Sequence, residues 1–291
     1  MTKAQRDTIF VEEARVIEHQ SFPAEQFVLR VEAPECARTA AAGSFAHIRC
    51  DADIPMRRPL SIMRADAETG VIDFLYKIVG AGLRALSHAR PGDTLSIMGP
   101  IGNGFVPDDS KPNKLMIGGG VGIPPMVFLA EQLCANRGSE GLFVIMGSEV
   151  PFPFEKVPSQ LDVAGIAPEV SDTMPFIESL GVPARLASLQ GFDGCYKGFV
   201  TDLAHDWLKA LDENNRNGAE IFACGPEPML EATAKLAARF GIPCQLCLEE
   251  FMACAVGGCA GCAVQVHGED GIAMKRVCVD GPVFPATAIY P

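Results

Sequence analysis

Alternating apolar and polar positions fill the first third of the chain. Between residues 8 and 106 the main runs read DTIFVEEARVIEHQ, QFVLRVEAP, SFAHIRC, VIDFLYKIV and DTLSIMGPIG. Phe27, Leu29 and Val31 show their period of two, and turn sequences such as ARPGD separate them. This pattern predicts an antiparallel β-barrel or sandwich. Only GLRALSHA, residues 82–89, has a helical pattern in this part of the chain.

The pattern changes after DDSKPNK, residues 108–114, which we expect to be a linker. Apolar runs typical of buried strands then alternate with amphipathic helical segments. The strands are KLMIGGG, GLFVIMGS, PARLASLQG and EIFACGP, and the helices are PPMVFLAEQLCANRG, GFVTDLAHDWLKALDE and PEPMLEATAKLAARFG. This alternation predicts a parallel sheet with helices on both faces. A last strand, CQLCLEE, leads into a cysteine-rich tail.

These patterns divide the chain into three parts. We expect an all-β barrel domain over residues 1–108, a parallel α/β domain over residues 109–242 and a small C-terminal subdomain over residues 243–291. A length of 291 residues fits about two ordinary domains of ~150 residues, with room for a small addition.

Charge and targeting signals narrow the class of protein. The net charge of −12 argues against nucleic acid as a partner, because nucleic-acid binders carry a basic surface. The N-terminal MTKAQRDTIFVEEARVIEHQ has no apolar core of a secretory signal, and no window is long and apolar enough to span a membrane. We therefore expect a cytoplasmic protein without a membrane partner.

Cysteine spacing gives the strongest chemical signal. Structural disulfides are rare in a reducing cytoplasm, and eleven cysteines cannot all pair. Cys254, Cys259 and Cys262 follow the spacing C-x4-C-x2-C, and Cys278 comes fifteen residues later. This is the ligand pattern of a plant-type [2Fe–2S] cluster. The small residues between the thiols let the backbone wrap closely around such a cluster and turn its N–H groups toward the sulfurs.

A zinc site is the rival interpretation of the same region. Cys244-x2-Cys247 and Cys259-x2-Cys262 together resemble the ligand pairs of a zinc ribbon. Residues three apart on a strand, however, point to opposite faces, which makes Cys244 and Cys247 a poor pair for one metal ion. That interpretation also gives Cys254 and Cys278 no role. The iron–sulfur interpretation is preferred, and the zinc one stays open.

Two glycine-containing loops follow buried strands. The first, IGGGVGIPP, contains Gly118, Gly119, Gly120 and Gly122 at a strand-to-helix turn, where backbone N–H groups can approach a pyrophosphate. The second, ACGPEPM, ends the strand EIFACGP, and its Cys224, Gly225 and Pro226 are candidate cofactor-binding residues. We expect Cys224 to face a nicotinamide, because ligands bind beyond the carboxyl ends of parallel strands. A tight structural turn and a buried strand-end cysteine remain the alternatives.

The barrel part contains a third candidate loop, RRPLSI. Arg58 could pair with a phosphate, Pro59 would stiffen the strand edge and Ser61 offers a hydroxyl to a flavin, although the same residues fit an ordinary edge strand. A second phosphate cradle is possible at residues 80–83. The five histidines are scattered without partner spacing, and we assign no catalytic residue.

Taken in order, RPLSI, GPIGNGF, GGGVGIPP, ACGPEPML, LEEFMACAVGGCAGC and CVDGPVF resemble one family. They resemble the electron transfer subunits of NAD-dependent, two-subunit dihydroorotate dehydrogenases, which are ferredoxin reductase-like flavoproteins. The resemblance runs from about Thr8 to Phe284, and its C-terminal motifs are the most particular to this family.

The resemblance implies FAD, NAD(H) and a [2Fe–2S] cluster as cofactors of the three parts, in that order. FAD would bind at two segments of the barrel part, Arg58, Pro59, Leu60 and Ser61, and Leu75, Tyr76 and Lys77, with Gly82 and Leu83 at its pyrophosphate. The family usually has Gly-Thr at the last pair, so here the site depends more on backbone N–H groups. SEVPFPFE, after the strand GLFVIMG, lacks an arginine for a 2′-phosphate, which favours NADH over NADPH.

The resemblance also implies a partner and an electron path. The partner would be an FMN-containing catalytic dihydroorotate dehydrogenase subunit, in a heterotetramer of two plus two. NAD(H) exchanges two electrons as hydride and the cluster takes one, so we hypothesise the order dihydroorotate, FMN, [2Fe–2S], FAD, NAD⁺. The alternatives are an NAD(P)H-dependent reductase subunit for another dehydrogenase, hydrogenase or oxygenase, and a zinc-containing interaction module.

Overall fold

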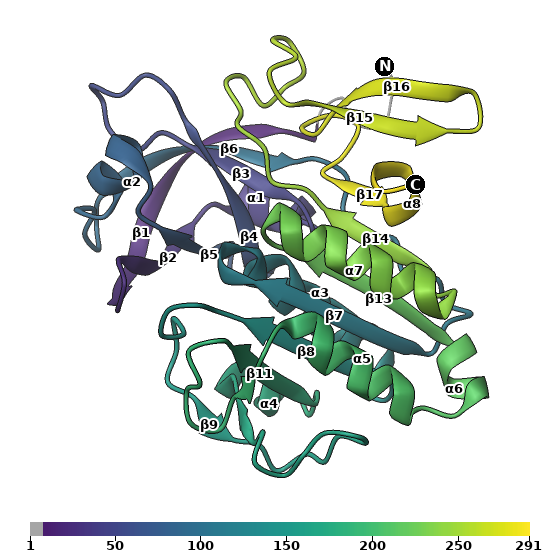
Figure 1. Cartoon of the computed structure of the whole chain (residues 1–291). Helices are drawn as coiled ribbons and strands as arrows, with labels where there is room; N and C mark the ends of the chain where they lie inside the picture. Colours follow the sequence, from purple (N-terminus) through teal and green to yellow (C-terminus); the bar gives the residue numbers. More distant parts are fainter. Residues whose placement is uncertain (1–7) are drawn as a thin grey trace.

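A computed structural model describes residues 8–291 (Figure 1). The first seven residues, part of the N-terminal segment judged to lack a secretory signal, lie outside the described residues. Antiparallel strands of the first part close into a barrel in the order β1-β2-β5-β4-β3-β6. They are β1 (Phe10–Phe22), β2 (Gln26–Glu32), β3 (Phe45–Ile48), β4 (Arg58–Asp66), β5 (Val71–Lys77) and β6 (Thr94–Ile101). The predicted barrel is confirmed.

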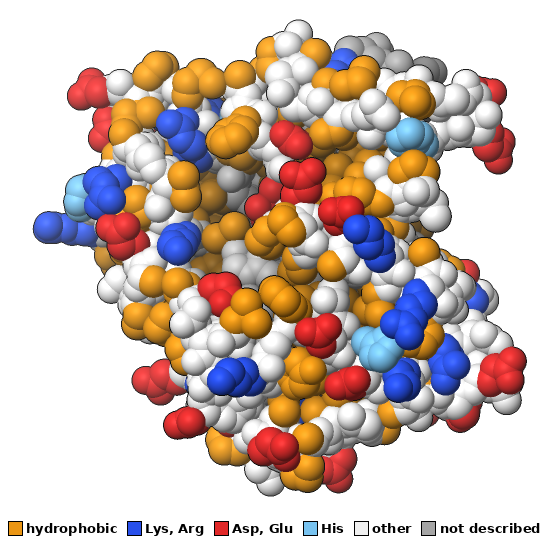
Figure 2. Space-filling view, in the orientation of Figure 1, with side chains coloured by type: hydrophobic (Ala, Val, Ile, Leu, Met, Phe, Trp, Pro, Cys, Tyr) orange, Lys and Arg blue, Asp and Glu red, His pale blue; other side chains and the backbone are white. Residues whose placement is uncertain are grey.

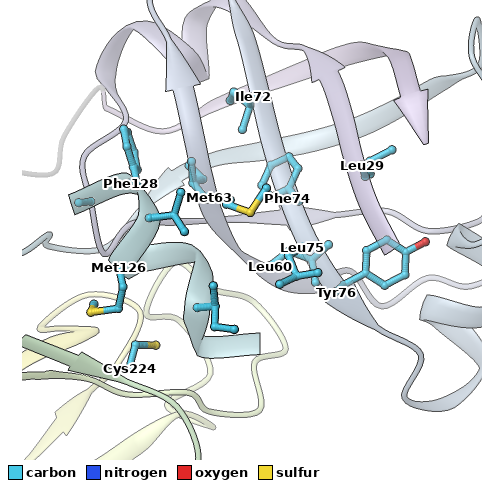
Figure 3. Close-up of a cluster of buried hydrophobic side chains, with 14 of the residues drawn as sticks. Leu29, Leu60, Met63, Ile72, Phe74, Leu75, Tyr76, Met126, Phe128 and Cys224 are labelled. Atoms are coloured by element: carbon cyan, nitrogen blue, oxygen red, sulfur yellow. The ribbon is translucent and has the colours of Figure 1, made fainter. Parts of the chain in front are cut away.

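Alternation along the strands fills the barrel. Leu29 and Val31 on β2 lie opposite Phe74 and Ile72 on β5, and all four are fully buried in one hydrophobic cluster. Figure 3 shows Leu29, Ile72 and Phe74 within it. The same cluster continues into Met126 and Phe128 of the central domain and reaches Cys224. The barrel and one face of the central sheet therefore share a core, which fixes their relative position.

Two short helices belong to the barrel part. The helix α2 (Gly80–Leu86) overlaps the segment 82–89 that was predicted to be helical and begins two residues before it. The expectation of a single helix was wrong, because α1 (Pro34–Thr39) also forms. Its first-turn N–H groups, from Glu35 and Cys36, donate to the carboxylate of Glu12 on β1. A cap supplied from a distant strand leaves no local sequence signal.

The central sheet has the strand order β12-β11-β8-β7-β13-β14-β17. Its strands are β7 (Asn113–Gly119), β8 (Leu142–Gly147), β11 (Ala184–Ser188), β12 (Tyr196–Lys197), β13 (Ala219–Cys224), β14 (Cys244–Cys247) and β17 (Val283–Pro285). All neighbouring pairs are parallel except β14 and β17, which are antiparallel. The buried strands predicted from their apolar runs are thus confirmed, and β17 adds an edge that the sequence did not predict.

Helices cover both faces of this sheet (Figure 1). The helix α3 (Ile123–Arg137) packs on the face that joins the barrel core, while α5 (Val200–Ala210) and α7 (Glu227–Phe240) bury apolar residues in a second cluster. The remaining short elements are α4 (Pro175–Ser179), α6 (Glu213–Asn217), α8 (Ala286–Ile289), the 3-10 turn η2 (Gly120–Gly122), and the two-residue strands β9 (Val157–Pro158) and β10 (Asp172–Thr173). Within residues 8–291, no helix combines the length and apolarity that crossing a bilayer requires.

The C-terminal part starts and ends inside the central sheet. Its first strand, β14, pairs with β13, and its last strand, β17, pairs back onto β14. Between them, residues 248–282 leave the sheet and carry the cysteines and the hairpin β15 (Ala263–Gly268) and β16 (Gly271–Arg276). The predicted subdomain of residues 243–291 therefore contributes two strands to the sheet of the neighbouring domain.

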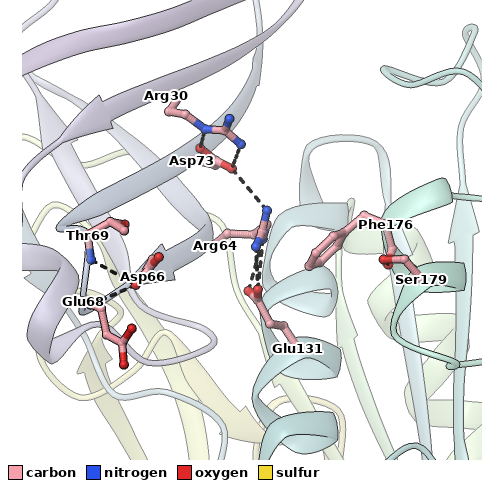
Figure 4. A network of polar contacts seen from close by, with 9 residues as sticks. All are labelled: Arg30, Arg64, Asp66, Glu68, Thr69, Asp73, Glu131, Phe176 and Ser179. Carbon is pink, nitrogen blue, oxygen red and sulfur yellow. Dashed lines mark hydrogen bonds and ion pairs between the residues drawn. The ribbon is translucent and has the colours of Figure 1, made fainter.

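Polar contacts also tie the barrel to the central domain (Figure 4). Arg64 on β4 donates to both carboxylate oxygens of Glu131 on α3, with a shortest distance of 2.7 Å, and its guanidinium lies 3.9 Å from the centre of the Phe176 ring on α4. Behind it, Asp73 on β5 accepts two hydrogen bonds from Arg30 at 2.7 and 2.9 Å. These contacts hold α3, and the glycine loop before it, against the barrel.

Candidate functional site

The four cysteines of the predicted cluster lie in pairs within the 248–282 segment. Sγ of Cys262 and Sγ of Cys278 are 3.3 Å apart, although sixteen positions separate them in the sequence. Cys254 forms the other pair with Cys259, whose backbone N–H donates to Sγ of Cys254 at 3.4 Å. The N–H of Gly258 donates to the same sulfur at 3.2 Å, and the N–H of Gly261 donates to Sγ of Cys259.

These N–H groups favour a thiolate. Burial acts to raise the pKa of Cys254, but hydrogen bonds from the backbone of Val256, Cys259 and Gly258 and from the Cys259 thiol bring it down to about 7. Deprotonated sulfur is the form that binds metal. Cys259 is exposed, whereas Cys262 and Cys278 are buried, so the cysteine loop reaches from the interior to the surface.

The bare backbone of the loop has a geometric reason. Gly257 has a φ of +80°, and a Cβ at this position would lie 2.5 Å from Cγ2 of Val279. Ala255 and Ala260 both have a φ of +54°, a left-handed conformation that disfavours larger, branched side chains. Ala255, Gly257 and Ala260 are therefore positions at which a larger side chain would disturb the fold of the loop around its sulfurs.

Two pairs of thiols fit a two-iron cluster better than a single metal ion. A [2Fe–2S] cluster takes four thiolates, two on each iron, whereas a zinc ribbon brings four ligands to one ion. The donor set and its N–H contacts thus fit the predicted cluster.

The zinc alternative does not fit. Cys244 is buried in the hydrophobic cluster under α7, and Cys247 is buried in the other cluster, on the opposite face of the sheet. Sγ of Cys247 contacts the carbonyl oxygen of Gly43 at 3.8 Å. Both thiols belong to the core, as the strand argument indicated.

The two glycine loops of the central domain meet at one edge of the sheet. Gly118 at the end of β7 lies beside Cys224 at the end of β13. A Cβ on Gly122 would lie 2.3 Å from the carbonyl oxygen of Cys224, and one on Gly225 would lie 3.2 Å from the N of Gly119. Gly120, with a φ of +55°, has open space around its Cβ position. Both loops thus present bare backbone to a common space.

The side chain of Cys224 connects this edge to the 248–282 segment. Cys224 is fully buried next to Cys247, and its Sγ lies 3.9 Å from Oε1 of Glu249. Its contact with Cys247 and its burial raise the pKa of the Cys224 thiol well above the ordinary value. Desolvation by the surrounding protein raises the pKa of the Glu249 carboxyl group, and the hydrogen bond that it accepts from the Cys224 thiol acts in the opposite direction.

In the barrel, two of the residues predicted to bind the flavin phosphates, Arg58 on β4 and Gly82 on α2, lie side by side. A Cβ on Gly82 would lie 2.8 Å from Nε of Arg58, so the guanidinium packs directly on the first turn of α2. That guanidinium donates to the carbonyl oxygens of Met56 and Arg57. Leu83 is buried against the barrel core, which agrees with a site built from backbone groups.

The second predicted flavin segment is more buried than the first. Leu60 and Leu75 are buried, while Pro59, Ser61 and Lys77 are partly exposed. Tyr76 points into the barrel, stacks on Phe27 at 5.3 Å and shares a 2.8 Å hydrogen bond with His19. Of Tyr76, therefore, only the backbone can contact a cofactor.

A hollow lies between the barrel and the central domain, with hydrophobic and acidic side chains around it (Figure 2). A separate open cavity of about 900 Å³ lies between the β1–β2 turn and the loop after β8. Phe22, Phe152, Phe154 and Phe192 line it, and it includes no predicted site residue.

The sequence analysis assigned no role to His47 or to Glu249. His47 on β3 is 1% exposed, and neither ring nitrogen has a hydrogen-bond partner in the described part of the chain. Its place opposite Pro59 of β4 depends on strand pairing, and the Glu249 contact depends on the end of β13. Phe45 and His47 are two residues apart on one strand and therefore share a face. This was the only indication in the local sequence that His47 lies beside a buried residue.

Comparison with known proteins agrees with this geometry. Residues 249–290 match a family model described as the iron–sulfur cluster binding domain of dihydroorotate dehydrogenase B. A protein of Caldanaerobacter subterraneus subsp. tengcongensis, named dihydroorotate dehydrogenase B (NAD(+)), electron transfer subunit, is 34% identical over 85% of this chain and 86% of its own length. A protein of a Geobacillus species with the same name is 33% identical over 94% and 96% of the two chains.

Solved structures show the same fold at lower identity. One is an NADH-dependent reduced ferredoxin-NADP oxidoreductase, with a TM-score of 0.74 and 24% identity over 96% of this chain and 90% of that chain. The cytochrome b5 reductase domain of Ulva prolifera nitrate reductase has a TM-score of 0.57 and 19% identity over 80% and 94% of the two chains. The barrel and central sheet are thus the ferredoxin reductase-like arrangement.

Proposed function

Because the chain belongs to the family of dihydroorotate dehydrogenase B electron transfer subunits, we propose that it passes electrons between a catalytic dihydroorotate dehydrogenase subunit and NAD(H). The observation that carries this proposal is the cysteine loop. Its four thiols lie in two pairs, and Glu249 of the same segment contacts Cys224 at the glycine loops. One segment thereby links a metal-binding loop to a nucleotide-binding edge.

Each part of the chain supplies one set of binding groups. Cys254, Cys259, Cys262 and Cys278 hold the [2Fe–2S] cluster. Arg58 and the first turn of α2 hold the FAD pyrophosphate, and the loops at residues 118–122 and 224–226 hold NAD(H). When bound, these groups supply two-electron exchange at the nicotinamide, one-electron exchange at the cluster and a flavin capable of both. The division into residues 1–108, 109–242 and 243–291 is proposed as a division of these tasks.

The loop after β8 supports NADH as the dinucleotide. Glu149 lies there, and its carboxylate accepts hydrogen bonds from the N–H of Leu189 and from Nε2 of Gln190, each at 3.4 Å. An acidic side chain after the second strand of such a sheet suits a ribose hydroxyl and repels a 2′-phosphate. We therefore propose NADH as the physiological nucleotide.

The surface around the cysteine loop suits a protein partner. Phe251 is 93% exposed and Val256 is 47% exposed, and Ile272 and Met274 on the adjoining hairpin are each 64% exposed. Exposed apolar residues grouped beside a redox centre favour a docked partner. We propose that this partner is the FMN-containing catalytic subunit, in a cytoplasmic heterotetramer of two plus two.

Anaerobic purification of two matched variants tests the proposal. Wild-type protein should contain FAD, iron and acid-labile sulfide and should give a paramagnetic signal when reduced. Cys259→Ser should lose the iron and the signal, keep FAD, and lose dihydroorotate-dependent NAD⁺ reduction with the catalytic subunit. Cys244→Ala, which changes a buried cysteine outside the loop, should keep all of them.

The results distinguish the alternatives. Colourless protein with zinc, or iron lost from Cys244→Ala as well, would contradict the assignment of the four ligands. Unchanged turnover of Cys259→Ser would show that electrons bypass the cluster. A complete set of cofactors without electron exchange with the catalytic dihydroorotate dehydrogenase subunit would assign the chain to another client enzyme.

A further inference from the structure

Arg185 on β11 is a buried cation without a carboxylate partner. It is 7% exposed, and it forms no ion pair with any residue in the described part of the chain. The other buried charges are paired. Lys114 lies 2.8 Å from the carboxylate of Glu220, and Asp73 lies 2.7 Å from the guanidinium of Arg30. Because an uncompensated buried charge is costly, the charge of Arg185 calls for an explanation.

The hydrogen bonds of Arg185 do not supply one. An arginine side chain has five N–H groups. Nη1 donates to the carbonyl oxygen of Ala184 at 2.7 Å, and Nη2 donates to that of Leu161 at 2.6 Å. Nε is buried and has no partner within residues 8–291. The two carbonyl oxygens are neutral acceptors, so they leave a full positive charge and further N–H groups unmatched.

A loop forms an open cavity beside this guanidinium. The short strands β9 and β10 pair with each other and so close the base of the loop between them, residues 159–171. This loop and Arg185 together line a cavity of about 650 Å³. Val163 and Ile166 of the loop pack against the hydrophobic cluster under α5, which holds the loop in place over the cavity.

The nearby carboxylates do not neutralise Arg185. Glu178 on α4 accepts hydrogen bonds from the hydroxyl of Ser159 and from the N–H of Gln160. Asp162 lines the cavity but is exposed, and it forms no ion pair with Arg185 at 4.0 Å or less. Burial lowers the pKa of Arg185, and the attraction of Glu178 and Asp162 opposes this effect only in part.

The cavity is separate from the cofactor sites. Arg185 is the second residue of β11 and so lies near the amino end of that strand, whereas the nucleotide loops follow the carboxyl ends of β7 and β13. Ala187, two residues further on and on the same face, is buried under α5, while the barrel packs on the other face of the sheet. None of the residues assigned to FAD, NAD(H) or the cluster lines this cavity.

We propose that the cavity under residues 159–171 binds a small organic anion, a carboxylate or phosphate group on an apolar body, with the anionic group against Arg185. Guanidinium N–H groups match the oxygens of both groups. The body would lie against the apolar part of the wall, which includes Leu161, Ile166 and Val170. This inference does not depend on the proposed function, because it uses none of the cofactor-binding residues.

Equilibrium dialysis of the anaerobic holoprotein tests the site. Benzoate and phenyl phosphate are the probes, which distinguish a carboxylate from a phosphate, and benzamide is the uncharged analogue. Saturating NAD⁺ keeps the probes from the nucleotide loops. Arg185→Met removes the charge at similar length, Arg185→Lys keeps the charge without the planar fork, and Arg38→Met changes an exposed arginine on α1 as the control.

Wild-type protein should bind one molecule of benzoate or of phenyl phosphate per chain, bind benzamide at least about tenfold more weakly, and melt at a higher temperature with the anion present. Arg185→Met should weaken anion binding at least about tenfold and lose the rise in melting temperature, and Arg38→Met should match wild type. Should Arg185→Met fail to fold, Arg185→Lys should also bind more weakly than wild type. Binding of neither anion to wild type, equal binding of benzamide, or wild-type affinity in the Arg185 variants would overturn the inference.

Discussion

Because the imidazole of His47 is buried, the stability of the fold depends on pH. The pKa of His47 is lowered to about 4, mainly by burial and then by the charge of Arg57, with a smaller effect of Arg58. Its ordinary pKa is about 6.5, so the unfolded chain takes up the proton first as pH falls. Stability from this group is complete above about pH 6.5 and is lost between there and pH 4.

Thermal unfolding at several pH values measures this contribution. Between pH 7.5 and pH 5.5, we expect the melting temperature of wild-type protein to fall further than that of His47→Gln, whose amide does not titrate. The His205→Gln variant serves as the control and should follow wild type. Parallel curves for wild type and His47→Gln would show that His47 is protonated at no cost, contrary to its burial.

At the residue scale, the sequence predicted those features that depend on the spacing of residues close together in the chain. The cysteine spacing picked out Cys254, Cys259, Cys262 and Cys278 from eleven cysteines, because the loop is built from near neighbours in the chain. It could not predict the contact between Cys224 and Glu249, which joins the end of a strand to a segment beyond the next helix and strand. The buried direction of Tyr76 also escaped, because its partner His19 comes from another strand.

At the scale of elements, the contact between two loops limits the size of the side chain that can replace a glycine. Gly122 packs on the backbone of Cys224, so Gly122→Ala should separate the loops that end β7 and β13. Overpacking of this kind costs about 1–3 kcal/mol. We expect a lower melting temperature and at least about tenfold weaker binding of NADH, given that 1.4 kcal/mol corresponds to tenfold in affinity.

Gly120 offers the matched control for this substitution. It lies in the same loop with open space at its Cβ position, so Gly120→Ala has only the strain of a φ of +55° to bear, about 1 kcal/mol. Equilibrium titration of NADH and thermal melts compare the two variants. Equal effects at both positions would show that loop strain matters here and contact between the loops does not.

Elements with their own apolar pattern were predicted correctly, and those that depend on a neighbour were not. The strands β7, β8 and β13 and the helices α3 and α7 carry continuous local signals. The helix α1 depends on Glu12 of β1 for its cap, and β17 has three residues that become a strand only against β14. In both, tertiary contacts supply what the local sequence lacks.

At the scale of the whole molecule, the exposed apolar side chains around the cysteine loop form the proposed docking surface. Phe251→Ser should weaken binding of the catalytic subunit about tenfold or more, because exposed aromatic side chains are frequent anchors of interfaces. Cofactor content and reduction by NADH should not change. Analytical ultracentrifugation or titration calorimetry with the catalytic subunit measures the affinity.

Phe199 provides the comparison on the central domain. It is 59% exposed at the start of α5, away from the cysteine loop, and Phe199→Ser should leave the affinity unchanged. An unaltered affinity of the Phe251→Ser protein would place the interface on another face. This prediction could not be made from the sequence alone, because apolar residues near the cysteines fit a buried position equally well.

The cysteine-bearing segment of residues 248–282 begins after β14 and ends before β17. Because these two strands are paired, the ends of the segment lie next to each other, about 4.8 Å apart across the sheet. An excursion with adjacent ends changes length at a small entropic cost, and each doubling adds only about 0.6 kcal/mol. Residues 248–282 are therefore an insertion between two paired strands whose length can change at little cost. A change in the length of this segment would therefore leave β14, β17 and the nucleotide-binding edge of the sheet in place.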